Sequence, residues 1–188
     1  WAWRMIKYLV GKSVAAMKKR YDYDAGYLLE VAEASTGGVL RLGFLPLLSQ
    51  YQAGVPVDVW AGAAMASTRD GDCGPCLQLV VNAAIEKGAD TAALRAALQG
   101  DYELAGDTGL GYRFGLAAIR DGVELDPLRD ELQQRFGEQS VISLSIAAAT
   151  GRAWPVIKRG LGHGRSCQAV TINDVQVDLV KDSAASAA

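Results

Sequence analysis

Apolar residues recur along most of this chain with the spacing of one face of a helix. Near the N-terminus, a pattern of i, i+3, i+4, i+7, i+8 and i+11 is followed by Ile6, Leu9, Val10, Ser13, Val14 and Met17. The cations Lys18, Lys19 and Arg20 come next, where positive charge suits the negative end of a helix dipole. The pattern therefore predicts an amphipathic helix that ends near residue 20.

Similar periodicity predicts helices up to residue 161. The expected helices span residues 25–34, 39–51, 57–68, 76–84, 90–98, 110–122, 127–136, 139–149 and 154–161. Glycine and proline are expected to separate them. The run 35–38 (Ser-Thr-Gly-Gly) should end a helix, Pro46 should end or kink the next one, and Gly88 is placed as a C-cap.

The pattern changes towards the C-terminus. Apolar and polar residues alternate over residues 169–180, on either side of Asn173 and Asp174. A period of two indicates extended segments, and such a pair between them favours a hairpin. The Ala/Ser tail, residues 183–188, is expected to be frayed. The sequence thus predicts an all-α helical bundle that ends in a short hairpin-like segment, organised as one domain over residues 1–182.

Composition and charge limit the kinds of partner that the chain is expected to bind. The chain has 188 residues, enough for one sizeable core, and its formal net charge is −2. Nucleic acid and anionic membrane surfaces both require clustered Lys and Arg, so neither is expected as a partner. Charges and glycines interrupt each apolar stretch before about 20 residues, so no membrane-spanning helix is expected. The expected location is the cytoplasm. The Gly-x-Gly in residues 106–111 follows no predicted strand, and no cofactor is expected.

The chain contains three cysteines, and two of them form the sequence Cys73-Gly74-Pro75-Cys76. An odd number does not suit a disulfide scaffold, and the role of the third, Cys167, stays open. Sulfurs in a Cys-x-x-Cys pair come within disulfide range when the second cysteine lies in the first turn of a helix. Pro75 favours that placement, because proline is common at the first helical position. There the helix dipole would stabilise a Cys76 thiolate, and Cys73 would resolve its oxidised form.

The pair has two other interpretations. Both cysteines can simply be small buried hydrophobic residues, which is a common fate for cysteine. The same four residues also occur in thioredoxin, where they follow a β-strand within an alternating β/α pattern. Here a helical segment precedes them and no Trp stands directly before Cys73, so a thioredoxin fold is excluded.

The order of elements around the pair resembles the carboxymuconolactone decarboxylase / alkylhydroperoxidase D-like superfamily. The resemblance consists of a helix, a polar link, the sequence Asp72-Cys73-Gly74-Pro75-Cys76, a helix that ends at Gly88, and a short helix from Asp90. It is most specific over residues 57–98 and looser over residues 107–150. It implies an all-α fold and a homo-oligomer. In peroxidase members the second cysteine attacks a peroxide and the first closes the disulfide, which gives Cys76 the peroxidatic role and Cys73 the resolving role, with a thiol as reductant.

The chain departs from the peroxidase members at two positions. Their proton relay has a His one helical turn after the second cysteine, where this chain has Val80, and a Glu on the preceding helix, near Trp60 or Ala61 here. The decarboxylase branch uses a His that this region also lacks. The expected function is a thiol-based oxidoreductase with a hydroperoxide as candidate substrate. The alternative is a non-catalytic oligomeric helical protein or small-ligand binder of the same family.

The one histidine of the chain, His163, lies between glycines and four residues before Cys167. It is a candidate for the base that is missing at Val80. A second interpretation is a structural zinc site formed by His163 with Cys73, Cys76 and Cys167. A third is a histidine in a turn that bonds backbone or solvent.

Overall fold

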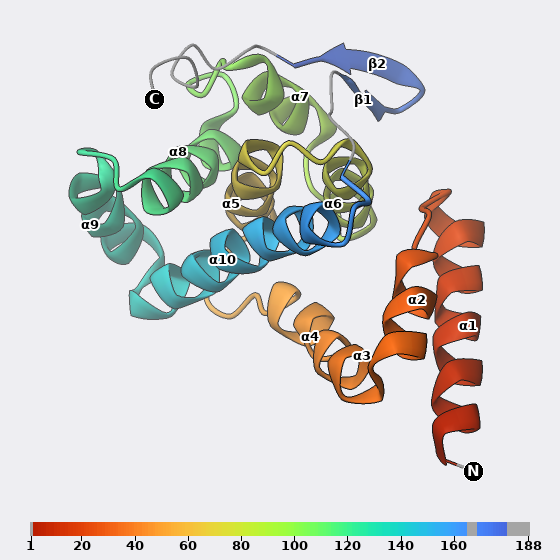
Figure 1. Ribbon diagram of the computed structural model, residues 1–188. Helices are drawn as coiled ribbons and strands as arrows, with labels where there is room; N and C mark the ends of the chain where they lie inside the picture. Colours follow the sequence, from red (N-terminus) through yellow and green to blue (C-terminus); the bar gives the residue numbers. More distant parts are fainter. Residues whose placement is uncertain (1, 165–168, 180–188) are drawn as a thin grey trace.

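The structure of the chain is a computed structural model that describes residues 2–164 and 169–179 (Figure 1). Its elements are α1 (Ala2–Tyr21), α2 (Tyr27–Ala34), α3 (Thr36–Leu42), α4 (Leu45–Ser49), α5 (Val57–Asp70), α6 (Gly74–Glu86), α7 (Thr91–Gln99), α8 (Gly106–Arg120), α9 (Leu125–Phe136), α10 (Glu138–Gly160), β1 (Ala169–Ile172) and β2 (Val175–Asp178). The predicted all-α bundle with a short C-terminal hairpin is confirmed. The expected frayed tail, residues 183–188, lies outside the described residues.

Helix α5 is the centre of the main core. Every residue from Val59 to Thr68 is buried, and α6, α8 and α10 pack around this helix (Figure 1). The closest approach is between α5 and α8, where a Cβ built on Gly111 would lie 1.9 Å from the backbone oxygen of Val59. Glycine at this position therefore allows the two backbones to pack in direct contact.

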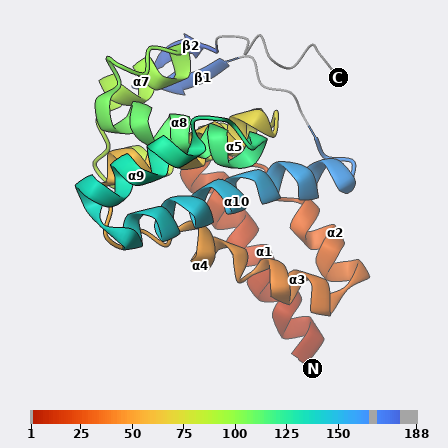
Figure 2. The same ribbon diagram turned by 90° about the vertical axis from the view of Figure 1, so that its left-hand side faces the viewer.

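Helices α1 and α2 form a hairpin beside this core, and we call it the N-terminal hairpin (Figures 1 and 2). At its tip, Arg20 and Tyr21 both bond the carboxylate of Glu86 at the end of α6, each at 2.7 Å. Short helices α3 and α4 lead from the hairpin back to the core, where α4 packs on α10. The hairpin is thus held at both ends.

Several predicted boundaries were wrong, for identifiable reasons. The run 35–38 starts a helix as well as ending one, because the Ser35 side chain accepts a hydrogen bond from the Gly38 N–H and caps α3. The single helix expected over residues 39–51 is two, with Pro46 in the first turn of α4. Gly88 has φ +91°, which agrees with its predicted role after the end of α6.

The two helices expected over residues 139–149 and 154–161 are one helix, α10, with Pro155 inside it. In the described residues, α10 is the one helix whose length and composition would allow it to cross a membrane. Gly151 and Arg152 interrupt its apolar sequence as expected, and the absence of a membrane-spanning helix stays a prediction. A core helix meets the same criterion, and 44% of the apolar window of α10 is buried within the fold.

The C-terminal hairpin is confirmed. Strands β1 and β2 pair antiparallel with Val170 opposite Val177, and both side chains are buried. Asn173 and Asp174 adopt positive φ values of 49° and 60°, which suit a two-residue turn. Gln78 on α6 exchanges two hydrogen bonds with the Thr171 backbone and fixes the hairpin against the helix that carries the cysteine pair.

Candidate functional site

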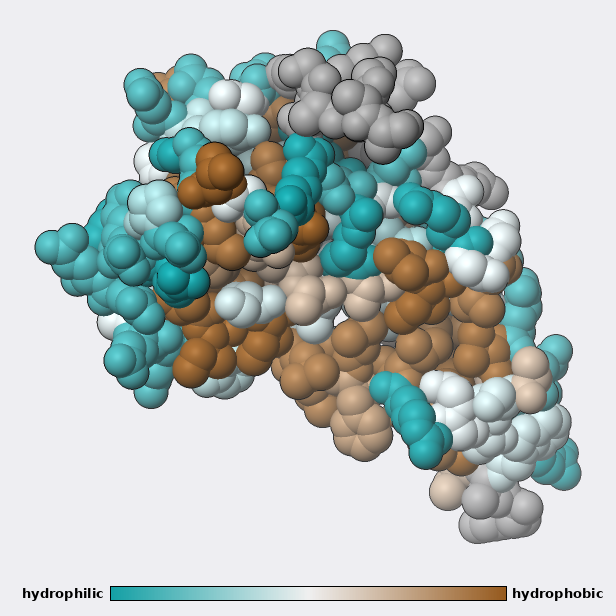
Figure 3. Space-filling view, turned by 60° about the vertical axis from the view of Figure 1, so that its left-hand side comes forward, coloured by the Kyte–Doolittle hydropathy of each residue, from teal (hydrophilic) through white to brown (hydrophobic). Residues whose placement is uncertain are grey.

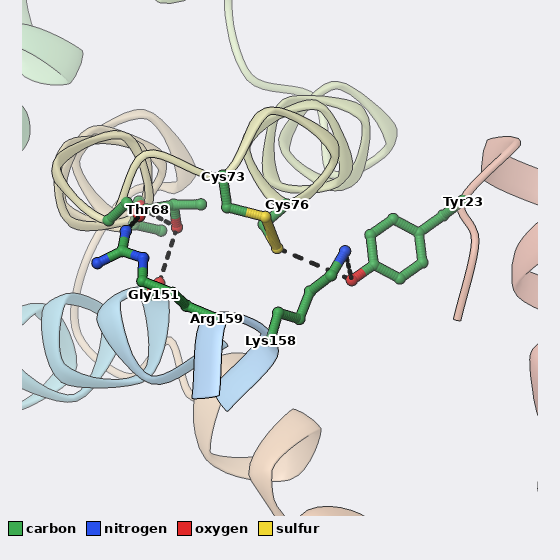
Figure 4. Close-up of a disulfide and its surroundings, with 9 residues drawn as sticks. Tyr23, Thr68, Cys73, Cys76, Gly151, Lys158 and Arg159 are labelled. Atoms are coloured by element: carbon green, nitrogen blue, oxygen red, sulfur yellow. Dashed lines mark hydrogen bonds between the residues drawn. A yellow bond between two sulfur atoms is a disulfide. The ribbon is translucent and has the colours of Figure 1, made fainter. Parts of the chain in front are cut away.

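The cysteine pair lies at the N-terminus of α6 (Figure 4). Cys73 is the N-cap residue, Gly74 is the first helical residue and Pro75 the second, one position later than predicted. Cys76 therefore lies in the first turn, and the two cysteines form a disulfide with their Cα atoms 5.3 Å apart. The prediction that the two sulfurs lie within bonding range is confirmed.

Helix α10 holds the turn that leads into Cys73. Arg152 forms an ion pair with Asp70, and Arg159 donates to the backbone oxygen of Gly71. Arg120 of α8 binds the other carboxylate oxygen of Asp70 at 2.6 Å. Two guanidinium groups thus compensate the charge of this carboxylate, which weakens the repulsion that it would exert on a thiolate at the start of α6.

Both sulfur-bearing residues are buried, with exposed fractions of 2% for Cys73 and 4% for Cys76. They belong to a second hydrophobic cluster, separate from the main core, whose other buried members are Tyr23, Ala25 and Tyr27. These three come from the N-terminal hairpin and the turn that joins its helices. The disulfide therefore lies between the start of α6, the hairpin and α10, whose Trp154 packs against the same cluster.

Tyr23 and Lys158 are polar groups beside the disulfide that the sequence did not single out. The Tyr23 hydroxyl lies 3.8 Å from Cys76 Sγ, and Lys158 Nζ donates to that hydroxyl at 3.3 Å (Figure 4). Lys158 is only 5% exposed, and its ammonium also lies over the rings of Tyr23 and Tyr27, at 4.8 and 5.4 Å from their centroids. The available signal was the position of Lys158 on the apolar stripe of α10, four residues after Trp154.

Burial is the largest influence on the two tyrosines. It raises the pKa of Tyr23, while a hydrogen bond from Tyr27 acts in the opposite direction. Burial also raises the pKa of Tyr27 strongly, with smaller contributions from Tyr23. Both hydroxyl groups therefore stay protonated across the physiological pH range.

His163 lies on the outer side of this cluster. Its Nε2 is 2.9 Å from Glu30 Oε2 of α2, and its ring centroid is 6.0 Å from that of Tyr27. Among the described contacts none joins His163 to a sulfur, and Tyr27 and Tyr23 connect it to Cys76. The catalytic role considered for His163 stays a prediction.

The positions at which the resemblance implies a relay are apolar in the structure. Trp60 and Ala61 are buried in the main core, and Val80 packs against it from α6. None of the three side chains can carry a proton. Within the described residues no group of three or more His, Cys, Asp or Glu side chains is arranged to hold a metal ion, and Cys167, the fourth ligand of the considered zinc site, lies outside them.

Comparison with known proteins gives no match: no protein-family model, no curated protein and no solved structure matches the chain. The features of the chain that indicate a function are therefore the disulfide and its neighbours.

Proposed function

We propose that the chain is a thiol-based oxidoreductase of the alkylhydroperoxidase D-like kind, in which Cys73 and Cys76 alternate between dithiol and disulfide. The observation that carries the proposal is the disulfide at the N-terminus of α6, with Cys76 in the first helical turn. A helix N-terminus favours a thiolate, and a thiolate is the form of cysteine that reacts with peroxides and disulfides. The all-α fold agrees with the expectation from the resemblance.

We further propose a small hydroperoxide as the oxidant. The Cys76 thiolate attacks the outer oxygen of ROOH, an S–O bond forms, the O–O bond breaks, and the departing alkoxide takes up a proton as ROH. The Cys73 thiol then attacks the sulfenic acid, the S–S bond forms and water leaves. Two electrons and two protons from an external dithiol restore the reduced pair.

Stopped-flow consumption of cumene hydroperoxide by the reduced protein tests this activity. We expect a second-order rate well above that of free cysteine at the same pH. Cys76→Ser should abolish the reaction, whereas Cys73→Ser should stop it at a sulfenic acid that dimedone traps. A wild-type rate no faster than that of free cysteine would contradict the peroxidase activity.

The burial of both sulfurs favours a second candidate, in which the disulfide only stabilises a non-catalytic helical protein or ligand binder. Equilibration with thiol buffers of known potential separates the two. A structural disulfide resists reduction, with a potential below about −300 mV, whereas a pair that cycles with a cellular thiol must lie above this value. The proposed function predicts the higher potential.

A further inference from the structure

We infer that Tyr23 and Lys158 provide, from outside the helices of the missing relay, the polar contacts that activate Cys76. The Tyr23 hydroxyl donates a hydrogen bond to the Cys76 sulfur, and Lys158 holds the Tyr23 oxygen in the orientation for that bond. The inference rests on the proposed redox function of the pair. It assigns Tyr23 as a catalytic residue, because its hydroxyl contacts the reacting sulfur, and Lys158 as a positioning residue.

The groups that carry a proton determine the direction of the hydrogen bond between Tyr23 and Cys76. A disulfide sulfur has no proton, so in the oxidised protein only the Tyr23 O–H can donate across the 3.8 Å to Cys76 Sγ. The Tyr23 oxygen accepts a hydrogen bond from Lys158 Nζ, which has no acceptor to offer in return. Its own proton is thus left for the sulfur, and the same donor remains in place for a thiolate after reduction.

Burial strengthens this contact. Tyr23, Cys76 and Lys158 are each at most 5% exposed, and hydrogen bonds to a charged group are strongest where water is excluded. Other titratable groups near the sulfur are Cys73, the N-cap residue of α6, and Tyr27 and Tyr21, which belong to or pack against the same cluster. Asp70 and Asp72 precede the pair in the chain, and Arg120 and Arg152 pair with Asp70. Asp24, which follows Tyr23, acts electrostatically on Tyr23, and the His163–Glu30 pair lies beyond Tyr27.

The contact contributes to both halves of the redox cycle. In the reduced protein the donor stabilises the Cys76 thiolate that attacks the hydroperoxide. In the reductive half, the thiolate of the external dithiol attacks Cys73 Sγ, a mixed disulfide forms, the Cys73–Cys76 bond breaks, and Cys76 leaves as a thiolate that receives the Tyr23 hydrogen bond. A leaving thiolate of lower pKa leaves faster, so one contact favours each step.

Titration of the Cys76 thiolate by its ultraviolet absorbance tests the inference, in a Cys73→Ser background so that one sulfur is observed. Tyr23→Phe removes only the hydroxyl and should raise the midpoint by about one pH unit, a roughly tenfold loss of thiolate at a fixed pH below it. Lys158→Met should raise the midpoint in the same direction, and Lys158→Arg should restore part of the difference. The matched control is Tyr112→Phe, because Tyr112 is a buried tyrosine whose hydroxyl accepts a hydrogen bond from Arg69. In this variant the midpoint of the Cys76 thiolate should not move.

The titration needs no turnover, so it separates this inference from the proposed activity. Two results would overturn the assignment of Tyr23 and Lys158. One is a Cys76 midpoint that Tyr23→Phe leaves unchanged, and the other is an ordinary thiol midpoint near about 8.5 in the Cys73→Ser protein that keeps Tyr23. Slow hydroperoxide consumption by a protein whose midpoint does respond to Tyr23→Phe would instead overturn the peroxidase activity and leave the assignment standing. If Lys158→Met fails to fold, Tyr23→Phe alone decides.

Discussion

At the scale of single residues, a threonine on α5 compensates for the proline inside α10. Pro155 has no N–H, so the backbone oxygen of Gly151 has no helical donor four residues later. The Thr68 hydroxyl lies 3.3 Å from this oxygen and 2.7 Å from the oxygen of Ala64 in its own helix. The hydroxyl therefore joins α10 to the helix that leads into the cysteine pair (Figure 4).

Removal of this hydroxyl should destabilise the fold. Thr68→Val keeps the shape of the side chain but removes the hydroxyl that the oxygens of Ala64 and Gly151 share, so the free energy of unfolding should fall by about 1–3 kcal/mol in urea denaturation. Thr68→Ser retains the hydroxyl and should lose less. In the matched control Thr150→Val, the hydroxyl bonds Ile146 and Ala147 oxygens that already have helical donors, so the loss should be smaller. Equal losses at 68 and 150 would contradict the compensation for Pro155.

At the scale of elements, periodicity located the helices because each one buries one face. It failed where a local signal has two meanings or where a partner lies far away in the sequence. Ser35 is both a helix breaker and an N-cap, and the structure uses it as a cap. The gap expected between residues 149 and 154 is helical, and the oxygen that Pro155 leaves without its usual donor is contacted by Thr68, 83 positions away from Gly151.

In the candidate site, too, local features were predictable from the sequence and contacts between distant residues were not. The sequence predicts the bonded pair at the start of α6, because spacing and helix initiation are local properties. Tyr23 and Lys158 could not be predicted in this way, since their contact joins residues 135 positions apart and exists only when the N-terminal hairpin packs beside α10. A lysine on an apolar stripe indicates that such a partner exists but does not say which residue it is.

The contact between α5 and α8 gives a prediction at the element scale. In Gly111→Ala the new Cβ would meet the backbone oxygen of Val59, which cannot move aside as a side chain can, so the helices must separate. We expect a loss of roughly 1–3 kcal/mol in the free energy of unfolding. Gly11→Ala in α1 is the matched control, because its Cβ meets nothing within 4 Å, and helix propensity should stabilise that variant by roughly 0.5–1 kcal/mol. Similar stability of the two variants would refute the close contact.

At the scale of the whole molecule, the N-terminal hairpin packs against the buried sulfurs and the surface carries exposed apolar side chains. Figure 3 shows hydrophobic surface across the lower half of one face. Exposed apolar residues of α3, α4 and the segments around them are Leu40, Phe44, Leu47, Leu48 and Tyr51. Large apolar patches are uncommon on monomers, so the homo-oligomer implied by the resemblance stays a prediction with a candidate surface.

Access to the disulfide should depend on the contact that Glu86 makes with the hairpin. Its carboxylate binds Arg20 and Tyr21, and the hydrogen bond from Arg20 is the largest cause that lowers the pKa of Glu86. Because the folded pKa is lowered, the contact stabilises the docked hairpin above the ordinary carboxylate pKa and is lost as the pH falls through the lowered value.

Glu86→Gln should therefore speed reduction of the Cys73–Cys76 disulfide by a trialkylphosphine at neutral pH. The ion pair is solvent-exposed, so we expect a modest rise of about twofold to fivefold, and the difference from the wild type should close in acid, as the pH falls through the lowered pKa of Glu86. Glu131→Gln is the matched control, since its carboxylate also pairs with an arginine, Arg135, but on α9, away from the hairpin. A rate that is the same in the wild type, Glu86→Gln and Glu131→Gln would mean that the reductant reaches the sulfurs without movement of the hairpin tip.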